Sequence, residues 1–271
     1  MTDVRTEPAP ASTTRARNPH GTHIWYELLT TDAEGAKAFY EAVVPGWKFG
    51  PSSADHHGYR EINAADGHAG GAMELNQDMI AGGAKPVWLG YVGVDDVDAT
   101  VARIEAKGGR VHLPAFDIPN VGRIAMVADP QGNAFYVMRG AIEQASNAFS
   151  TEADGHVNWN ELSTTDPAAA RQFYGELFGW TSDDFMPMGE LGEYRFFAHE
   201  GTTIGALSAC MAGTPAGWRY YIRVPSIATA AEAVTAGGGT IAMGPHEVPG
   251  GDHILIGHDP QGAEFALVGK L

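Results

Sequence analysis

The chain contains the same pattern of residues twice. Residues 25–32 (WYELLTTD) return as residues 159–166 (WNELSTTD), and each run is followed by Phe-Tyr and then by Gly-Trp. Asp-Pro-Gln-Gly stands near the end of each copy, at 129–132 and 259–262. The copies are offset by 159 − 25 = 134 residues at the start and by 259 − 129 = 130 at the end. So constant an offset indicates a tandem duplication of a domain of about 120 residues.

The duplication predicts the domain organisation. A chain of 271 residues is long enough for two domains that each bury a core. We expect residues 19–140 to form the first domain, 141–154 a linker and 155–271 the second domain. Residues 1–18 are rich in Pro, Ala, Thr and Arg and are expected to form a disordered tail.

Composition excludes several classes of partner and compartment. The sequence has no run of 18 apolar residues and its first residues lack the apolar core of a secretory signal, so we expect neither a membrane span nor secretion. A single cysteine fits a reducing cytoplasm. The net charge of −16 would repel phosphate backbones, so nucleic acid is not an expected partner.

Each half reads as a strand, a helix and three further strands, in that order, twice over. Alternating polar and apolar residues predict an opening strand, and Asp32 and Asp166 are typical helix N-caps. Gly46 and Gly179 are expected to end these first helices. The fold class is therefore α+β, with four βαβββ modules in the chain.

This arrangement resembles the vicinal oxygen chelate superfamily, which includes glyoxalase I, bleomycin-resistance proteins and extradiol dioxygenases. The repeated Asp, Phe-Tyr, Gly-Trp and Asp-Pro-x-Gly motifs carry the resemblance, which is strongest to two-domain actinobacterial glyoxalase-like proteins. The resemblance implies a tandem pair of glyoxalase-like domains whose curved mixed sheets enclose cavities. It implies a site inside such a cavity but no particular reaction.

The resemblance also implies where metal ligands would stand in metal-dependent members. A divalent ion needs several His or carboxylate ligands that converge on it. Of the eight matching positions only Glu74 offers one, so we expect no metal of the usual kind and no other cofactor. The positions are Trp25, Glu74, Leu89 and Tyr136 in the first domain and Trp159, Ser208, Arg219 and Ala266 in the second.

Two glutamates are the candidate catalytic groups. Residues two apart on a strand share a face, so Trp25 and Glu27 should point into the first cavity, and Trp159 and Glu161 into the second. A carboxylate on a half-apolar face is subject to a raised pKa and can act as a general acid or base beside a carbonyl group. The alternative is that both glutamates hold the fold together through hydrogen bonds or ion pairs.

Alternating residues on another strand are candidate ligand contacts in the second domain. Arg219, Tyr221 and Arg223 would face the second cavity, where an arginine can hold a carboxylate or phosphate with two hydrogen bonds. The alternative for Arg219 is an internal ion pair with Glu161. His253 is also expected to border this pocket.

Aromatic residues dominate the matching face of the first domain. Leu89, Tyr91 and Tyr136 would form a lining suited to a flat organic ligand. Trp25 and Trp159 are expected either to stack on such a ligand or to pack in the core.

These observations lead to ranked hypotheses about function. The first is metal-independent isomerase or lyase chemistry on a carbonyl compound, with Glu27 or Glu161 as acid or base. The second is binding or sequestration of an aromatic or cationic compound, which the negative charge favours. Metal-dependent glyoxalase or dioxygenase activity ranks third. The expected partner is a small organic molecule, and the protein is expected to be a monomer or a homodimer.

Overall fold

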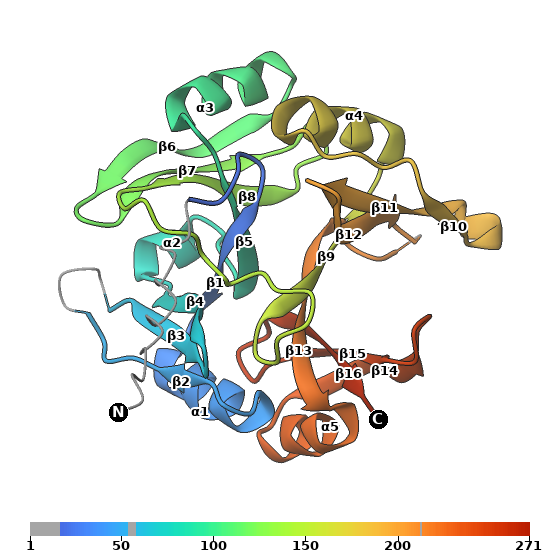
Figure 1. Cartoon of the computed structure of the whole chain (residues 1–271). Helices are drawn as coiled ribbons and strands as arrows, with labels where there is room; N and C mark the ends of the chain where they lie inside the picture. Colours follow the sequence, from blue (N-terminus) through green and yellow to red (C-terminus); the bar gives the residue numbers. More distant parts are fainter. Residues whose placement is uncertain (1–16, 54–57, 212) are drawn as a thin grey trace, which may run out of the picture.

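The computed structural model describes residues 17–53, 58–211 and 213–271. Each half of the chain forms one curved mixed sheet of eight strands, and the two sheets stand side by side in Figure 1. Most of the expected tail, residues 1–16, lies outside the described residues. Arg17 and Asn18 contact the linker instead, through hydrogen bonds with Glu143 and Ser146.

The first half consists of two βαβββ modules, as the sequence predicts. The short helix α2 between them is not predicted by the sequence analysis. The elements are β1 (His23–Thr30), α1 (Ala33–Val43), β2 (Lys48–Phe49), β3 (Arg60–Ala64), β4 (Gly67–Glu74), α2 (Gln77–Ala81), β5 (Val87–Gly93), α3 (Val97–Ala106), β6 (Arg110–Ile118), β7 (Gly122–Ala128) and β8 (Ala134–Gly140).

The second half repeats this order, except that its described residues form no helix corresponding to α2 and add a 3-10 turn, η2 (Gly189–Leu191), between the second and third strands. Its elements are β9 (Val157–Thr164), α4 (Pro167–Phe178), β10 (Phe185–Pro187), β11 (Glu193–His199), β12 (Thr202–Ala209), β13 (Gly217–Ser226), α5 (Ile227–Ala236), β14 (Thr240–Glu247), β15 (His253–His258) and β16 (Glu264–Lys270). In the described residues no helix is long and apolar enough to cross a membrane.

The two sheets have the same strand order. It is β2-β3-β4-β1-β5-β8-β7-β6 in the first half and β10-β11-β12-β9-β13-β16-β15-β14 in the second. The opening strands of the two modules of each half pair antiparallel at the centre, which places Glu27 opposite Leu89 and Glu161 opposite Arg219. Duplication therefore puts the two glutamates at equivalent points of equivalent sheets.

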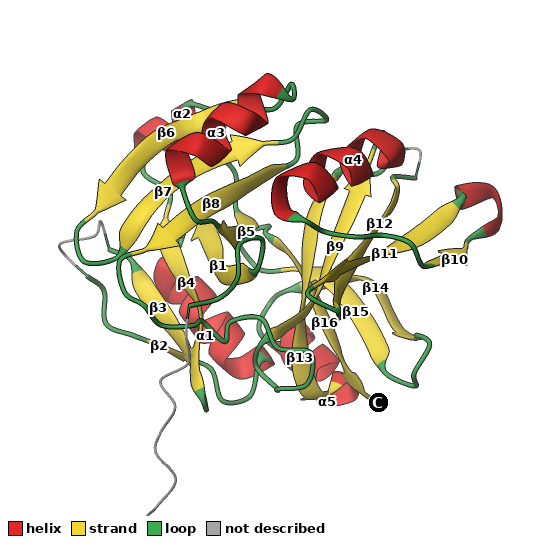
Figure 2. Ribbon diagram, turned by 45° about the horizontal axis from the view of Figure 1, so that its top comes forward, coloured by secondary structure: helices red, strands yellow, loops and turns green. Residues whose placement is uncertain are grey.

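The backs of the two sheets pack against each other. Tyr26 and Leu28 of β1 share a buried apolar cluster with Tyr220 and Ile222 of β13, and α1 packs beside α5. Because the backs are buried together, the concave faces point in opposite directions, away from the middle of the molecule (Figure 2). The chain therefore presents two separate concave faces rather than one shared cavity.

The repeated motifs of the sequence meet across the boundary between the halves. The hydroxyl of Tyr40 on α1 donates to Asp259 of the second Asp-Pro-Gln-Gly turn at 3.1 Å, and that of Tyr174 on α4 donates to Asp129 of the first at 3.0 Å. In addition, the Trp88 Nε1–H donates to the Tyr40 hydroxyl at 2.9 Å. The motifs that identify the duplication are thus buried contacts between the two copies.

The tryptophans of the two Gly-Trp motifs also cross between the halves. Trp47 donates to the carbonyl of Gly155 at 2.7 Å, and Trp180 donates to that of Gly21 at 2.8 Å. Gly21 has a φ of +93°, and a Cβ there would lie 2.3 Å from the carbonyl oxygen of Phe178. Only glycine fits this approach of the chain to the end of α4.

The expected helix caps are mostly confirmed. Asp32 and Asp166 accept hydrogen bonds from the backbone N–H groups three residues on, as N-caps do. Gly179 ends α4 in the left-handed conformation with φ 73°. The expected end of α1 at Gly46 is wrong, since α1 ends at Val43 with Val44 as an extended C-cap.

Candidate functional sites on the two concave faces

The concave face of the first sheet gathers the residues predicted to line the first cavity. Leu89, Tyr91 and Tyr136 are buried in one apolar cluster, and Trp25 packs against it. The rings of Tyr91 and Tyr136 stack with centroids 4.3 Å apart and planes 12° from parallel. These side chains, from three central strands, form an aromatic and apolar layer in which Leu89, Tyr91 and Tyr136 are each at most 5% exposed.

Glu27 lies at the floor of this face and is 5% exposed. The Tyr91 hydroxyl donates to its Oε2 at 2.9 Å, and none of the ion pairs between described residues involves it. Burial raises the pKa of the Glu27 carboxyl to about 7, and the hydrogen bond from Tyr91 opposes that shift. Glu27 is thus a carboxyl group that titrates near neutral pH in an apolar setting.

Tyr59 belongs to this site, although the sequence analysis did not select it. The Trp25 Nε1–H donates to its hydroxyl at 2.7 Å, and the charge of Glu27 contributes, after burial, to a pKa well above the usual tyrosine value. The residue precedes β3 and is followed by an arginine, as is Tyr194 in the second copy. This repeated Tyr-Arg pair was a signal in the sequence that could have revealed both tyrosines.

The second concave face repeats the layout with different chemistry. Trp159 Nε1–H donates to the Tyr194 hydroxyl at 2.9 Å, and Tyr194 donates to Glu161 Oε2 at 2.7 Å. Arg219 replaces Leu89 and forms ion pairs with Glu161 at 2.8 Å and with Glu264 at 2.9 Å. The structure thus shows the internal ion pair, which was the alternative interpretation of Arg219.

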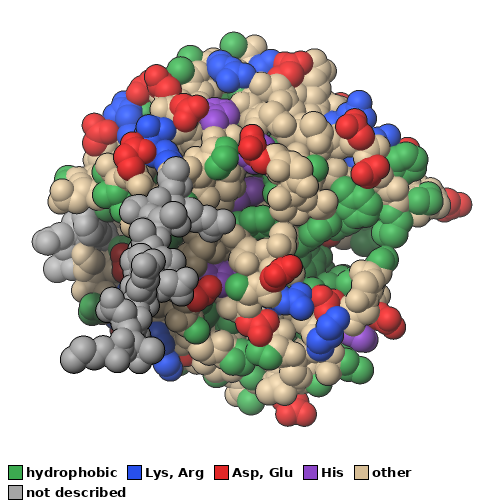
Figure 3. Space-filling model, viewed as in Figure 1, with side chains coloured by type: hydrophobic (Ala, Val, Ile, Leu, Met, Phe, Trp, Pro, Cys, Tyr) green, Lys and Arg blue, Asp and Glu red, His purple; other side chains and the backbone are tan. Residues whose placement is uncertain are grey.

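Aromatic side chains remain partly exposed on the second face. Trp159 and Phe196 pack edge to face with ring centroids 6.0 Å apart, and the hydroxyl of Tyr221 lies 3.3 Å from both oxygens of Glu161. Figure 3 shows hydrophobic side chains over β10 and β11, on the right of the view, beside a hollow in the surface. This face is therefore more open and more polar than the first.

Two residues predicted to line the second cavity do not meet Glu161. Arg223 lies on the concave face but forms an ion pair with Asp252 at 2.9 Å and lies 3.6 Å from Asp154. His253 faces the back of the sheet, because its neighbour Ile254 points to the concave side and side chains alternate along a strand. The prediction for His253 is wrong by this parity.

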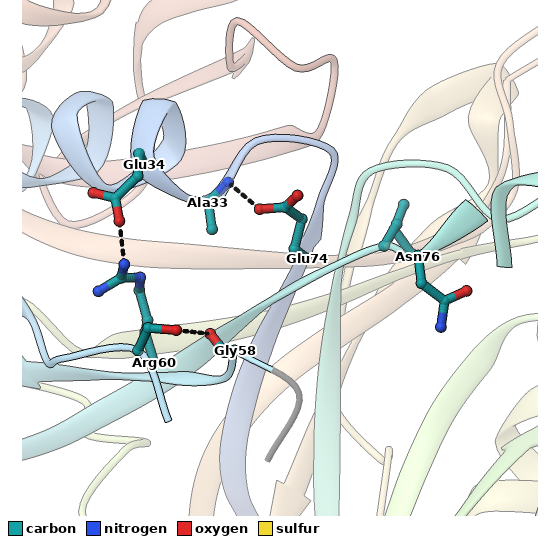
Figure 4. Close-up of a pocket in the computed structure, with 8 residues that line it drawn as sticks. Ala33, Glu34, Gly58, Arg60, Glu74 and Asn76 are labelled. Carbon is teal, nitrogen blue, oxygen red and sulfur yellow. Dashed lines mark hydrogen bonds and ion pairs between the residues drawn. The ribbon is translucent and has the colours of Figure 1, made fainter. Parts of the chain in front are cut away.

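Glu74 also faces away from the concave side. It pairs with Thr30 at the end of β1, whereas Met73 packs in the concave apolar cluster. Glu74 accepts a hydrogen bond from the Ala33 N–H at 3.4 Å, beside a pocket of about 310 Å³ that the ion-paired Glu34 and Arg60 also line (Figure 4). Glu74 therefore does not share the concave face with Glu27.

The groups around Glu27 and Glu161 do not fit a metal centre of the usual kind. The groups around Glu27 are tyrosine hydroxyls and the apolar Leu89, and the groups around Glu161 are tyrosine hydroxyls and an arginine. Among the residues described by the structure, no group of three or more His, Cys, Asp or Glu side chains could hold a metal ion.

Comparisons with known proteins agree with the fold. The family model of the Glyoxalase/Bleomycin resistance protein/Dioxygenase superfamily matches residues 22–137 and 155–267. CFP32 of Mycobacterium tuberculosis, whose glyoxylase name is provisional, is 33% identical over 94% of this chain and 97% of its own. The anthracycline biosynthesis protein DnrV of Streptomyces peucetius is 28% identical over 92% of this chain and 93% of its own.

Solved structures show the same architecture at lower identity. The Mn(II)-bound glyoxalase from Novosphingobium aromaticivorans has a TM-score of 0.63 at 19% identity, covering 93% of this chain and 83% of that one. A mutant homoprotocatechuate 2,3-dioxygenase from Brevibacterium fuscum has a TM-score of 0.66 at 16% identity, and the match covers 96% of this chain and 74% of that one. At these identities the likeness shows the fold alone. With the family model matched in both halves, the chain belongs to the Glyoxalase/Bleomycin resistance protein/Dioxygenase superfamily.

Proposed function

We propose that the protein binds a flat organic carbonyl compound on its first concave face and moves a proton on the carbon next to the carbonyl, with Glu27 as the acid or base. The observation that carries this proposal is the environment of Glu27, a buried carboxyl with a pKa raised to about 7. A general base works best when its pKa lies near the working pH. The ionised form of Glu27 is available at neutral pH and forms no ion pair with the residues that the structure describes.

The lining of the face supports a flat ligand. The stacked Tyr91 and Tyr136 rings and the side chain of Leu89 offer aromatic and apolar contacts around Glu27. The relative from Streptomyces peucetius is named for the biosynthesis of anthracyclines, which are fused-ring aromatic ketones. We carry over from that name only the class of ligand, a flat compound with a carbonyl group.

Glu161 is not proposed as a second base. It forms an ion pair with Arg219 and accepts a hydrogen bond from Tyr194, so both of its oxygens already have partners within the protein. Removing a proton from a substrate would require this carboxylate to give up those partners.

Exchange of an acidic C–H proton tests the proposal directly. The probe is 2-tetralone, a flat aromatic ketone, and the loss of its α-proton signal in D₂O is followed by NMR. Glu27→Gln is expected to lower the catalysed exchange at least about 100-fold, the usual scale of a lost general base. Glu74→Gln, which changes a carboxyl on the back of the same sheet, is expected to keep the wild-type rate. Equal rates for wild type and Glu27→Gln would refute the proposal.

A second candidate function is binding without turnover on the second concave face. It is favoured by the partly exposed Trp159 and Phe196 beside two carboxylates, Glu161 and Glu264, that share one arginine. Such a face suits an aromatic or cationic compound. Titration calorimetry with 9-aminoacridine checks this, and Trp159→Ala should weaken binding about 5- to 30-fold. Phe185→Ala should not, because Phe185 pairs with Arg195, the neighbour of Phe196 on the opposite side of the sheet, and its ring contacts that arginine. If Trp159→Ala binds 9-aminoacridine as tightly as Phe185→Ala does, this second candidate function is wrong.

A further inference from the structure

The two concave faces differ in where one tyrosine hydroxyl points. On the second face a continuous chain runs from Trp159 to Tyr194 to Glu161, with hydrogen bonds of 2.9 and 2.7 Å. Tyr194 therefore accepts from the indole and gives its own hydrogen to the carboxylate. All of its bonding capacity as a donor is used inside the protein.

On the first face the equivalent chain is broken after its first step. The Trp25 indole donates to the Tyr59 hydroxyl at 2.7 Å, but Glu27 accepts its hydrogen bond from Tyr91 instead. Within the described part of the chain, the Tyr59 hydroxyl hydrogen has no acceptor and Glu27 Oε1 has no donor. The Tyr59 hydroxyl and Glu27 Oε1 are thus a free donor and a free acceptor on the same face, within the described part of the chain.

A glycine explains the difference between the faces. Gly71 of β4 lies opposite Glu27, and Ala206 of β12 occupies the same place opposite Glu161. A Cβ at Gly71 would lie 1.8 Å from the Tyr59 hydroxyl oxygen, so this hydroxyl occupies space that a methyl group fills in the second half. Without a side chain at position 71, Tyr59 settles against the strand rather than against the carboxylate.

We propose that Tyr59 is a second catalytic residue of the first face, donating a hydrogen bond to the carbonyl oxygen of the substrate while Glu27 removes the neighbouring proton. This inference rests on the proposed function. The C–H bond breaks, its proton forms an O–H bond on Glu27, and the electron pair moves onto the carbonyl oxygen as an enolate. Return of the proton to carbon completes the cycle. Because no atom changes its oxidation state, the step needs no oxidant or reductant.

The surroundings suit this role for Tyr59. The indole of Trp25 donates to its oxygen, which fixes the ring and strengthens the hydroxyl as a donor. Burial and the nearby charge of Glu27 raise its pKa well above the usual value, so the hydroxyl keeps its hydrogen at neutral pH. A preorganised donor aimed at a developing oxyanion is among the strongest contributions to catalysis.

The test combines exchange of 2-tetralone with binding of 2-naphthol, a stable analogue of its enol. Tyr59→Phe is expected to lower exchange roughly 100-fold or more and to weaken 2-naphthol binding about 10-fold, the scale of one lost hydrogen bond. Gly71→Ala, which forces the hydroxyl off the strand while keeping both catalytic side chains, is expected to lower exchange as well. Glu27→Gln should abolish exchange and leave 2-naphthol binding within twofold.

The two proposals fail in different ways. If Glu27→Gln keeps the wild-type exchange rate, the proposed function is wrong. If Glu27→Gln loses exchange while Tyr59→Phe keeps both the rate and the 2-naphthol affinity within twofold, only the role of Tyr59 is wrong. Circular dichroism of each variant confirms that a lost rate does not come from a lost fold.

Discussion

At the scale of single residues, one neighbour decides what each copied glutamate can do. Glu27 faces Leu89 across the sheet and forms no ion pair with any described residue, whereas Glu161 faces Arg219 and is ion-paired. Removing a charge from water without a partner favours the protonated carboxyl. The same position in two copies of a domain therefore holds a group that titrates near neutral pH in one copy and a fixed ion pair in the other.

The raised pKa of Glu27 predicts a change in stability with pH. Since the folded-state pKa is about 7 against an ordinary value of 4.5, the folded protein binds the proton more tightly than the unfolded chain. The free energy of unfolding should therefore fall as pH rises from about 4.5 to about 7, by at most about 3 kcal/mol.

Glu27→Gln should remove this loss of stability at higher pH, because a glutamine side chain stays neutral at every pH. We expect the variant to be more stable than wild type at pH 8 by roughly 1–3 kcal/mol, with little difference at pH 4.5. Urea unfolding at the two pH values measures this. A variant that is less stable than wild type at pH 8 would show that the ionised Glu27 supports the fold.

At the scale of elements, the duplicated motifs are contacts between the halves. The tyrosine of the Phe-Tyr motif, Tyr40 on α1 and Tyr174 on α4, donates a hydrogen bond to the aspartate of the Asp-Pro-Gln-Gly turn in the other half. These aspartates also hold their own turns, since Asp259 accepts from the backbone N–H groups of Gln261 and Ala263. The retention of the motifs in both copies is thus explained by packing and not by chemistry.

Removal of one such hydroxyl should destabilise the protein without touching either concave face. Tyr40→Phe removes the side-chain donor to Asp259 Oδ2 and the acceptor of the Trp88 indole. The expected cost is about 1–3 kcal/mol in the free energy of unfolding. A double-mutant cycle with Asp259→Asn, followed by urea unfolding, measures the coupling. Additive effects of the two substitutions would mean that the hydrogen bond contributes nothing.

Much of the element order could be predicted from the sequence, because strand alternation, aspartate caps and glycine stops are local signals. The helix α2 was missed because its five residues carry no apolar period and none of them is buried. Glu74 and His253 were placed among the cavity residues because the sequence does not fix which face of a sheet each one takes, and a shift of one residue moves a side chain to the other side. Tyr59 was missed because its role depends on Trp25, which is 34 positions away in the chain.

At the scale of the whole molecule, the halves are joined back to back and their concave faces look outward. The core between them draws residues from both copies, including Phe39 and Phe265, whose rings lie 5.6 Å apart. Each half therefore depends on the other for burial of its apolar surface, while the two sites stay independent.

Separated halves should not fold alone. Residues 19–140 and 155–271, expressed apart, would each expose the apolar back of a sheet and one face of its helices. We expect neither to show a cooperative thermal transition, and we expect a 1:1 mixture to recover one, with size-exclusion chromatography detecting the complex. A cooperative transition in either isolated half would show that the domains are autonomous.

The most direct test of metal-free proton transfer by Glu27 is the pH dependence of 2-tetralone exchange by protein treated with chelator. Because the base must be ionised, the rate should rise with pH through a single ionisation near 7, reach a plateau, and be absent in Glu27→Gln. A rate that disappears on chelation and returns with an added divalent metal would contradict the account, as would a wild-type profile with no ionisation near pH 7.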